Sequence, residues 1–380
     1  MSKTVSAGVA MFAMLFGAGN VIFLLALGRE AGSMVGWAIL GFCLTAVLVP
    51  LLGLISMMLY DGDYRRFLGR TGLIPGVILT MVCMVLIGPF GAIPRCINIA
   101  YSATKWYFPD LPLAYFGAGA VTLIFFLAFK QSSVVELIGK YLGPLKLSLL
   151  LAIIVVGILW VQGNPTLVDV SPESLVLKGM TEGYGTMDLL GTIFFSGLIV
   201  RSLKRGMEDE SDYKAIAFEG LKAGSIGALL LGLVYTGFCL VASFHGPSVA
   251  DVNRYELLNA LAPYILGPQG GMLTNAAVAV SCVVTALALT TVLAEYLHKT
   301  IFRGRIGYIP ALAVTTVLSG LMTNLGFMQI MTLIVPIVVA CYPALIMLAF
   351  TNLGYKLFGF PYVKAPVFIT LAITIFFMLR

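Results

Sequence analysis

The chain has 380 residues, of which 60% are hydrophobic and 11% are charged, and its mean hydropathy is +1.01. Soluble domains carry about 25% charged residues, so this composition excludes a soluble domain and indicates a membrane protein with several spans. We attribute the net charge of +6 to loops that face anionic membrane lipid rather than to nucleic-acid binding.

The apolar residues fall into eleven runs separated by short polar loops. The runs cover approximately residues 6–27, 34–59, 73–104, 111–129, 141–162, 187–200, 216–244, 271–297, 307–323, 328–350 and 365–379. No small-residue cleavage site follows the first run, so we read it as a spanning helix rather than a removed signal peptide. The chain is therefore predicted to be an all-α polytopic protein with one transmembrane domain over residues 1–380.

Lysines and arginines are distributed unevenly between the loops. If the N-terminus is cytoplasmic, 16 of the 23 basic residues lie on the inner side and five on the outer side. This bias predicts a cytoplasmic N-terminus. All six cysteines lie in apolar runs without paired metal-ligand spacing, and we expect them to be free thiols.

The first run contains Phe16, Gly17, Ala18, Gly19 and Asn20 at its centre. Glycine costs about 1 kcal/mol relative to alanine inside a helix, so this stretch marks a weak point. A break in a membrane helix is tolerated where it is buried in protein or lines a cavity, and there it can bind ions or polar groups. The alternative is that the glycines only allow two helices to pack closely.

The third and fifth runs each contain a basic residue at membrane depth. Arg95 follows two prolines and two glycines within residues 88–94, and such a buried charge is a candidate functional group unless it reaches the outer surface. Lys146 lies about one and a half turns inside the fifth run. It either reaches the inner surface or points inward, where it could exchange a proton.

The sixth run is the shortest interior one and contains Phe194, Phe195, Ser196 and Gly197 at mid-depth. Short or glycine-interrupted segments in matching positions of two halves indicate a transporter site. We therefore expect helices 1 and 6 to be broken and helices 1–5 and 6–10 to form an inverted repeat. Its halves would cover about 6–162 and 187–350, with an extra helix at 365–379. Residues 252–266 are predicted to form an amphipathic surface helix.

The eighth run carries Ser281 and Thr285, which are four residues apart and share a helix face. Two hydroxyls on one face suit a dehydrated alkali cation. The alternative is that each hydroxyl bonds back to its own helix.

Together these stretches resemble the bacterial branched-chain amino acid:cation symporter family (BrnQ), within the amino acid-polyamine-organocation superfamily. The matching stretches, in order, are residues 16–20, 88–89 with 94–95, 143–146, 186–188, 284–286 with 294–295, and 324–326. The family often has a glutamate after the helix 3 arginine, where this chain has Ser102, and this leaves the partner of Arg95 open. The family also commonly has a twelfth helix, for which this chain ends too early.

The resemblance implies the five-plus-five inverted-repeat fold of the bacterial leucine transporter, in a bacterial cytoplasmic membrane. It implies a substrate site between helices 1 and 6, walled by helices 3 and 8. The substrate residues would be Leu15, Phe16, Gly17, Ala18, Gly19, Asn20, Phe90, Ile93, Phe194, Phe195, Ser196, Gly197 and Leu289. The substrate carboxylate would meet the N–H groups of residues 18–20, and a Na⁺ site would use Ala13, Phe16, Ser281, Cys282 and Thr285.

The function expected from this resemblance is Na⁺-driven import of leucine, isoleucine or valine, without a bound cofactor. The alternative is H⁺-coupled import of these amino acids or methionine through Lys146, with Arg95 as a second coupling candidate. The predicted partners are an apolar amino acid and membrane lipid, with no nucleic acid. An intramembrane enzyme is a remote alternative, because no H-E-x-x-H or G-x-S-x-G motif is present.

Overall fold

The computed structural model describes residues 3–161, 163–204, 213–252, 254 and 256–378. Every regular element within these ranges is helical. In the first part of the chain these are α1 (Lys3–Leu15), α2 (Ala18–Ala31), α3 (Val35–Cys43), α4 (Val49–Met58), α5 (Tyr64–Leu68), α6 (Leu73–Ile87), α7 (Ala92–Lys105), α8 (Leu113–Ala128), α9 (Gln131–Leu137) and α10 (Gly143–Leu159). They continue as α11 (Pro172–Gly185), α12 (Asp188–Lys204), α13 (Tyr213–His245), α14 (Leu257–Tyr296), α15 (Tyr308–Thr323), α16 (Phe327–Phe358) and α17 (Lys364–Met378).

Each of the eleven predicted apolar runs coincides with helix. Among the described residues, six helical segments are long and apolar enough to cross a membrane, and the bent pair α11–α12 makes a seventh. Four further apolar helices, α1, α8, α15 and α17, are shorter. The predicted all-α membrane architecture is therefore confirmed.

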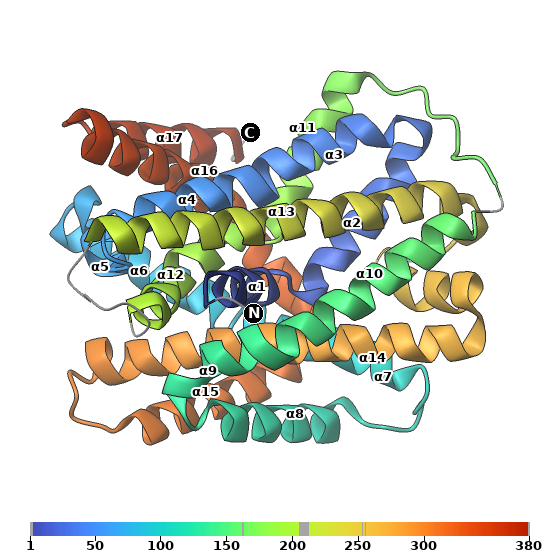
Figure 1. Cartoon of the computed structure of the whole chain (residues 1–380), viewed down its shortest axis with the longest axis horizontal. Coiled ribbons are helices and arrows are strands. Elements are labelled where there is room, and N and C mark those ends of the chain that lie inside the picture. Colours follow the sequence, from blue (N-terminus) through green and yellow to red (C-terminus); the bar gives the residue numbers. More distant parts are fainter. Residues whose placement is uncertain (1–2, 162, 205–212, 253, 255, 379–380) are drawn as a thin grey trace.

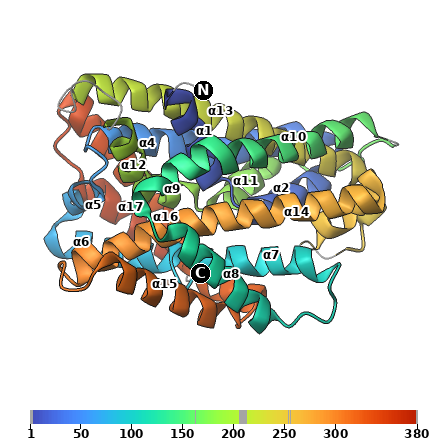
Figure 2. The ribbon, with the colours of Figure 1, turned by 60° about the horizontal axis from the view of Figure 1, so that its bottom comes forward.

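Helix α1 lies in the middle of the bundle, where it contacts α10, α12, α13 and α14 (Figure 1). Its composition explains this position, because every residue from Ala7 to Leu15 is apolar and buried. On the other side of α14, α7, α8 and α15 form an outer group that packs against it (Figure 2). The centre of the bundle is therefore bounded by α1, α12 and α14, with α7 beside α14.

Glycines interrupt the helical backbone at two further places. Helices α6 and α7 are separated by a turn at residues 88–91, as the prolines and glycines there predict. In α14 the backbone departs from helical geometry at Gly267, whose φ is 69°. The predicted surface helix at 252–266 therefore corresponds to the first part of α14, which begins at Leu257; residues 253 and 255 lie outside the described part.

Candidate functional site

The first helix is broken where the sequence predicts. α1 ends at Leu15 and α2 begins at Ala18, so Phe16 and Gly17 lie between them. Gly17 is extended, with φ −83° and ψ 156°. The break leaves the Phe16 carbonyl available to side chains from other helices.

Three side chains from two other helices donate to that carbonyl. The Lys146 amine of α10 and the hydroxyls of Ser281 and Thr285 of α14 all bond to the Phe16 carbonyl oxygen, the latter two at 3.4 and 3.2 Å. Lys146 also donates to the Ala13 carbonyl at 2.8 Å. Its side chain is 0% exposed, so the alternative in which Lys146 reaches the inner surface is wrong.

Most residues assigned to a cation site therefore meet around one point. The hydroxyls of Ser281 and Thr285 donate across to the first broken span, in contrast to the alternative in which each bonds to its own helix. Cys282 was assigned through its backbone carbonyl, and its side chain lines a separate apolar cavity between α7, α8 and α14.

The second broken span is α11–α12, which bends by 43° at Thr186 and Met187. This corrects the predicted position of the break at residues 194–197, because those residues lie inside the continuous helix α12. There Ser196 donates to the Ile193 carbonyl within the helix. Gly197 packs closely against Gly62, so its missing side chain serves helix packing and not a break.

The residues at this second break have special geometry. Met187 is a non-glycine residue with φ 59°, a conformation that costs free energy and is concentrated at functional sites. Asp188 then opens α12, where the positive end of the helix dipole favours a carboxylate. The Asp188 carboxylate accepts hydrogen bonds from the Asn20 amide and the Tyr235 hydroxyl.

Arg95 is also buried at this break. Its side chain is 3% exposed and donates to the carbonyls of Gly185 at 2.9 Å and Thr186 at 3.5 Å. These carbonyls end α11, where the helix dipole is negative and favours a cation. Arg95 therefore holds the end of α11, and the alternative in which it reaches the outer surface is wrong.

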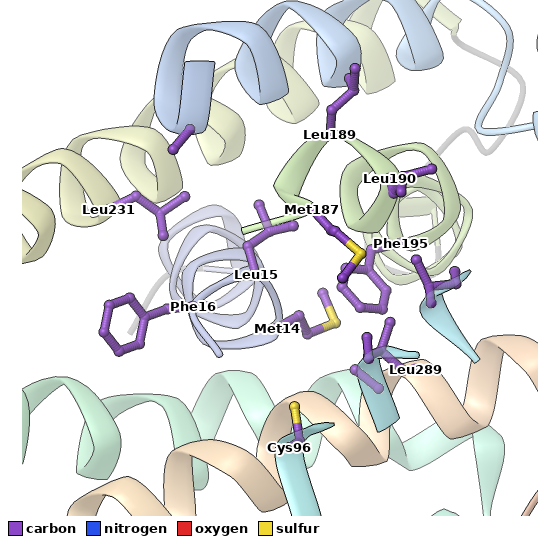
Figure 3. Packing of buried hydrophobic residues seen from close by; sticks show 14 of the residues in the cluster. Met14, Leu15, Phe16, Cys96, Met187, Leu189, Leu190, Phe195, Leu231 and Leu289 are labelled. Atoms are coloured by element: carbon purple, nitrogen blue, oxygen red, sulfur yellow. The ribbon is translucent and has the colours of Figure 1, made fainter. Parts of the chain in front are cut away.

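A small cavity of about 30 Å³ lies between the two breaks. This volume is below the range of small-ligand sites, so an amino acid would fit only when the two broken spans move apart. It is lined by Met14, Leu15, Gly17, Asn20, Ile87, Ala92, Arg95, Cys96, Thr186, Met187, Asp188, Gly191, Phe195, Thr285 and Leu289. Figure 3 shows several of these apolar side chains pointing toward one another from α1, α12 and α14. One side of the site is therefore apolar, and Asn20, Arg95 and Asp188 supply polar groups.

The predicted substrate residues divide into two groups. Leu15, Gly17, Asn20, Phe195 and Leu289 line the cavity. Phe16, Gly19, Phe90, Ile93, Phe194, Ser196 and Gly197 are not among its lining residues, and the side chain of Ala18 lies outside the described part.

The structure explains the positions of three of the predicted substrate residues. Phe90 lies in the turn between α6 and α7 and is 38% exposed. Phe194 packs against Tyr64, away from the cavity. The backbone N–H of Asn20 donates to the Gly17 carbonyl at 3.0 Å, so the predicted use of this N–H for a substrate carboxylate is wrong, and Asn20 faces the cavity through its side chain.

Asp188 is the main site residue that the sequence reasoning missed. Asp188 enters the sequence prediction only as part of the matching stretch 186–188, because the segment between the runs 141–162 and 187–200 is treated there as a polar loop. A signal was present, since Ser171 and Pro172 form a helix start before the apolar Leu175 and Val176. A helix that begins at Pro172 and ends at Gly185 places Asp188 just after a helix break.

Comparison with known proteins agrees with this geometry. A family model described as "Branched-chain amino acid transport protein" matches residues 1–379. The branched-chain amino acid permease BraB of Bacillus subtilis is 33% identical over 365 residues, covering 94% of this chain and 81% of that protein. The permease BrnQ of Escherichia coli K12 is 28% identical over 363 residues, covering 92% of this chain and 80% of that protein.

Solved transporter structures share the fold. An inward-facing structure of Mhp1 has a TM-score of 0.63 at 13% identity, covering 93% of this chain and 77% of that one. MhsT in complex with L-phenylalanine has a TM-score of 0.58 at 14% identity, covering 99% and 98%. The two broken spans and these similarities confirm the predicted leucine-transporter-like inverted-repeat fold. The relatives are named as permeases, in agreement with the expectation that the chain is not an enzyme. The chain belongs to the branched-chain amino acid transport protein family.

Proposed function

We propose that this protein imports leucine, isoleucine and valine as a secondary active symporter. The observation that carries the proposal is the cavity between two broken spans, in which Leu15, Phe195 and Leu289 face three polar side chains. An aliphatic amino acid has the same division between an apolar and a charged part. The relatives are named as branched-chain amino acid permeases, which is the same substrate class.

A cation gradient supplies the energy for this import. A membrane potential of 100 mV is worth about 2.3 kcal/mol per charge, and a zwitterionic substrate with one cation carries one charge. We propose a proton as the coupling cation, with Lys146 as its carrier. The amine lies against the carbonyls of Ala13 and Phe16, so protonation of this group is coupled directly to the geometry of the break in helix 1.

Sodium is the second candidate, and a separate observation favours it. The hydroxyls of Ser281 and Thr285 converge on the Phe16 carbonyl, and these oxygens are suitable Na⁺ ligands. The Lys146 amine and a Na⁺ ion would compete for the same carbonyl oxygens. The two coupling modes are therefore distinguishable by substitution of Lys146.

We place the protein in the bacterial cytoplasmic membrane with the N-terminus in the cytoplasm. The bias of lysine and arginine toward one set of loops supports this orientation. The surrounding partner is membrane lipid, against which many apolar side chains are exposed. Methionine is expected to compete for the site because its side chain is also apolar and flexible.

Uptake of leucine into proteoliposomes under imposed gradients tests the proposal. Wild-type uptake should follow an inward proton gradient, and Lys146→Met should abolish that dependence. The control Lys140→Met removes a largely exposed lysine of the neighbouring segment, paired with Glu136, and should preserve it. Leucine uptake that ignores both proton and Na⁺ gradients would contradict symport, and Na⁺-driven uptake that survives Lys146→Met would assign the coupling to sodium.

A further inference from the structure

Two residues that line the cavity each have one buried polar atom without a hydrogen-bond partner among the described residues. These atoms are Nε of Arg95 and Oδ1 of Asn20. Both side chains are almost fully buried, at 3% and 1% exposed. Buried polar atoms in folded proteins are nearly always satisfied, so one unpaired donor and one unpaired acceptor on residues that line one cavity point to a ligand that carries both kinds of group.

The Asp188 carboxylate has spare capacity to accept hydrogen bonds. Its Oδ1 accepts from the Asn20 amide nitrogen at 3.2 Å, and its Oδ2 accepts from the Tyr235 hydroxyl and, at 3.4 Å, from the same Asn20 nitrogen. The Thr186 hydroxyl is a third neutral donor to this carboxylate. An ionised carboxylate offers about four lone-pair sites, so with three donor side chains about one acceptor position remains for a ligand. The exposed fraction of Asp188 is 2%.

Arg95 lies close enough to Asp188 for an electrostatic interaction, but its hydrogen bonds are directed elsewhere. Its guanidinium donates to the carbonyls of Gly185 and Thr186 instead. The hydrogen-bond partners of the Asp188 carboxylate are the neutral side chains of Asn20, Tyr235 and Thr186. A buried carboxylate that is hydrogen-bonded only to neutral groups is costly, and a cationic ligand group would remove that cost.

We propose that Asp188 and Asn20 Oδ1 bind the α-ammonium group of the substrate, and that Arg95 Nε binds its carboxylate. This inference rests on the proposed function and adds the side chains that read the zwitterion. It makes the site specific for free α-amino acids. A carboxylic acid with the same aliphatic chain would leave the Asp188 carboxylate without a cationic partner, and an amine would leave Arg95 Nε unpaired.

The test compares leucine with 4-methylpentanoate, which is leucine without its α-amino group. Binding of each compound to the purified full-length protein is measured by isothermal titration calorimetry. In Asp188→Asn, which keeps the shape of the side chain but removes its charge, the preference of the protein for leucine should fall by roughly 30-fold or more. If Asp188 has only a structural role, the substitution should weaken the binding of both compounds alike and leave the preference for leucine unchanged.

Two further variants complete the design. Glu173→Gln removes an exposed carboxylate from the same broken span and should keep the wild-type preference. If Asp188→Asn does not yield folded protein, Asp188→Ser replaces it and should show the same fall. A preference within about threefold of wild type in either Asp188 variant would overturn the inference. Wild-type protein that binds no branched-chain amino acid would overturn the proposed function instead.

Discussion

At the scale of single residues, the atoms next to each glycine of the first break determine whether a larger residue would fit there. A Cβ atom at Gly19 would lie 3.1 Å from Nε and 3.2 Å from Cζ of Arg95. A Cβ atom at Gly17 would find its nearest neighbour, the Thr285 methyl carbon, at an ordinary 3.6 Å. Gly19 is therefore needed for the position of the Arg95 guanidinium, whereas Gly17 is less constrained.

Gly19→Ala is expected to weaken leucine binding about tenfold without lowering the melting temperature. The added methyl displaces the Arg95 guanidinium, and overpacking of this kind typically costs about 1–3 kcal/mol. Alanine has a higher helix propensity than glycine by about 1 kcal/mol, which offsets the effect on folding. Calorimetric titration and thermal melts measure the two quantities. Gly36→Ala, at a position with no atom within 4 Å of the new Cβ, is the control, and equal binding by both variants would contradict this account.

The sequence predicts those site residues whose chemical character is unusual for their own segment. Arg95 and Lys146 are charges within apolar runs, so each was identified without knowledge of the fold. The partners of these residues come from distant parts of the chain, as with Arg95 and Gly185 or Lys146 and Phe16. Such pairings depend on how the helices pack, which the composition of one segment does not determine.

At the scale of elements, α11 packs against α3 with almost no side chains between their backbones. Gly179 and Gly183 are four residues apart on α11, in the small-xxx-small spacing that allows membrane helices to approach closely. A Cβ at Gly179 would lie 2.2 Å from the Ala38 carbonyl oxygen, and one at Gly183 would lie 2.0 Å from the Thr45 hydroxyl. This close packing fixes the half-helix whose end carries the second break.

Gly179→Ala is therefore expected to destabilise the protein by about 1–3 kcal/mol, since the new methyl must separate α11 from α3. A thermal melt in detergent would report a lower melting temperature than wild type. The control is again Gly36→Ala, which lies on α3 itself but faces no neighbour. A melting temperature for Gly179→Ala equal to that of Gly36→Ala would show that the two helices are not held by this contact.

The two broken spans differ in how visible they are in the sequence. In the first, two glycines and an asparagine interrupt an uncharged run, so the break was predicted at the correct residues. In the second, Lys178 and Glu182 make α11 resemble a surface loop, and the break occurs at Thr186 and Met187 without a glycine at either position. Tertiary packing against α3 overrides this polar composition and holds α11 as a helix.

At the scale of the whole molecule, charged side chains join different elements near the end predicted to face the cytoplasm. Lys204 of α12 pairs with Asp61, and Arg201 of α12 pairs with Glu295 of α14. The loop after α14 lies at the left end of the molecule in Figure 1, and the loop after α7 lies at the right end. The proposed orientation places the first of these loops in the cytoplasm and the second outside.

Single-cysteine labelling of intact cells tests this orientation with two matched substitutions. Phe108, which follows α7, and Phe302, which follows α14, are both exposed. A membrane-impermeant maleimide should label Phe108→Cys and leave Phe302→Cys unlabelled until the cells are permeabilised. Background from native thiols should be low, because four of the six cysteines are buried and the other two are partly buried. The reverse labelling pattern would show that the protein has the opposite orientation in the membrane. The lysine- and arginine-rich loops would then lie outside, against the rule that such loops are cytoplasmic.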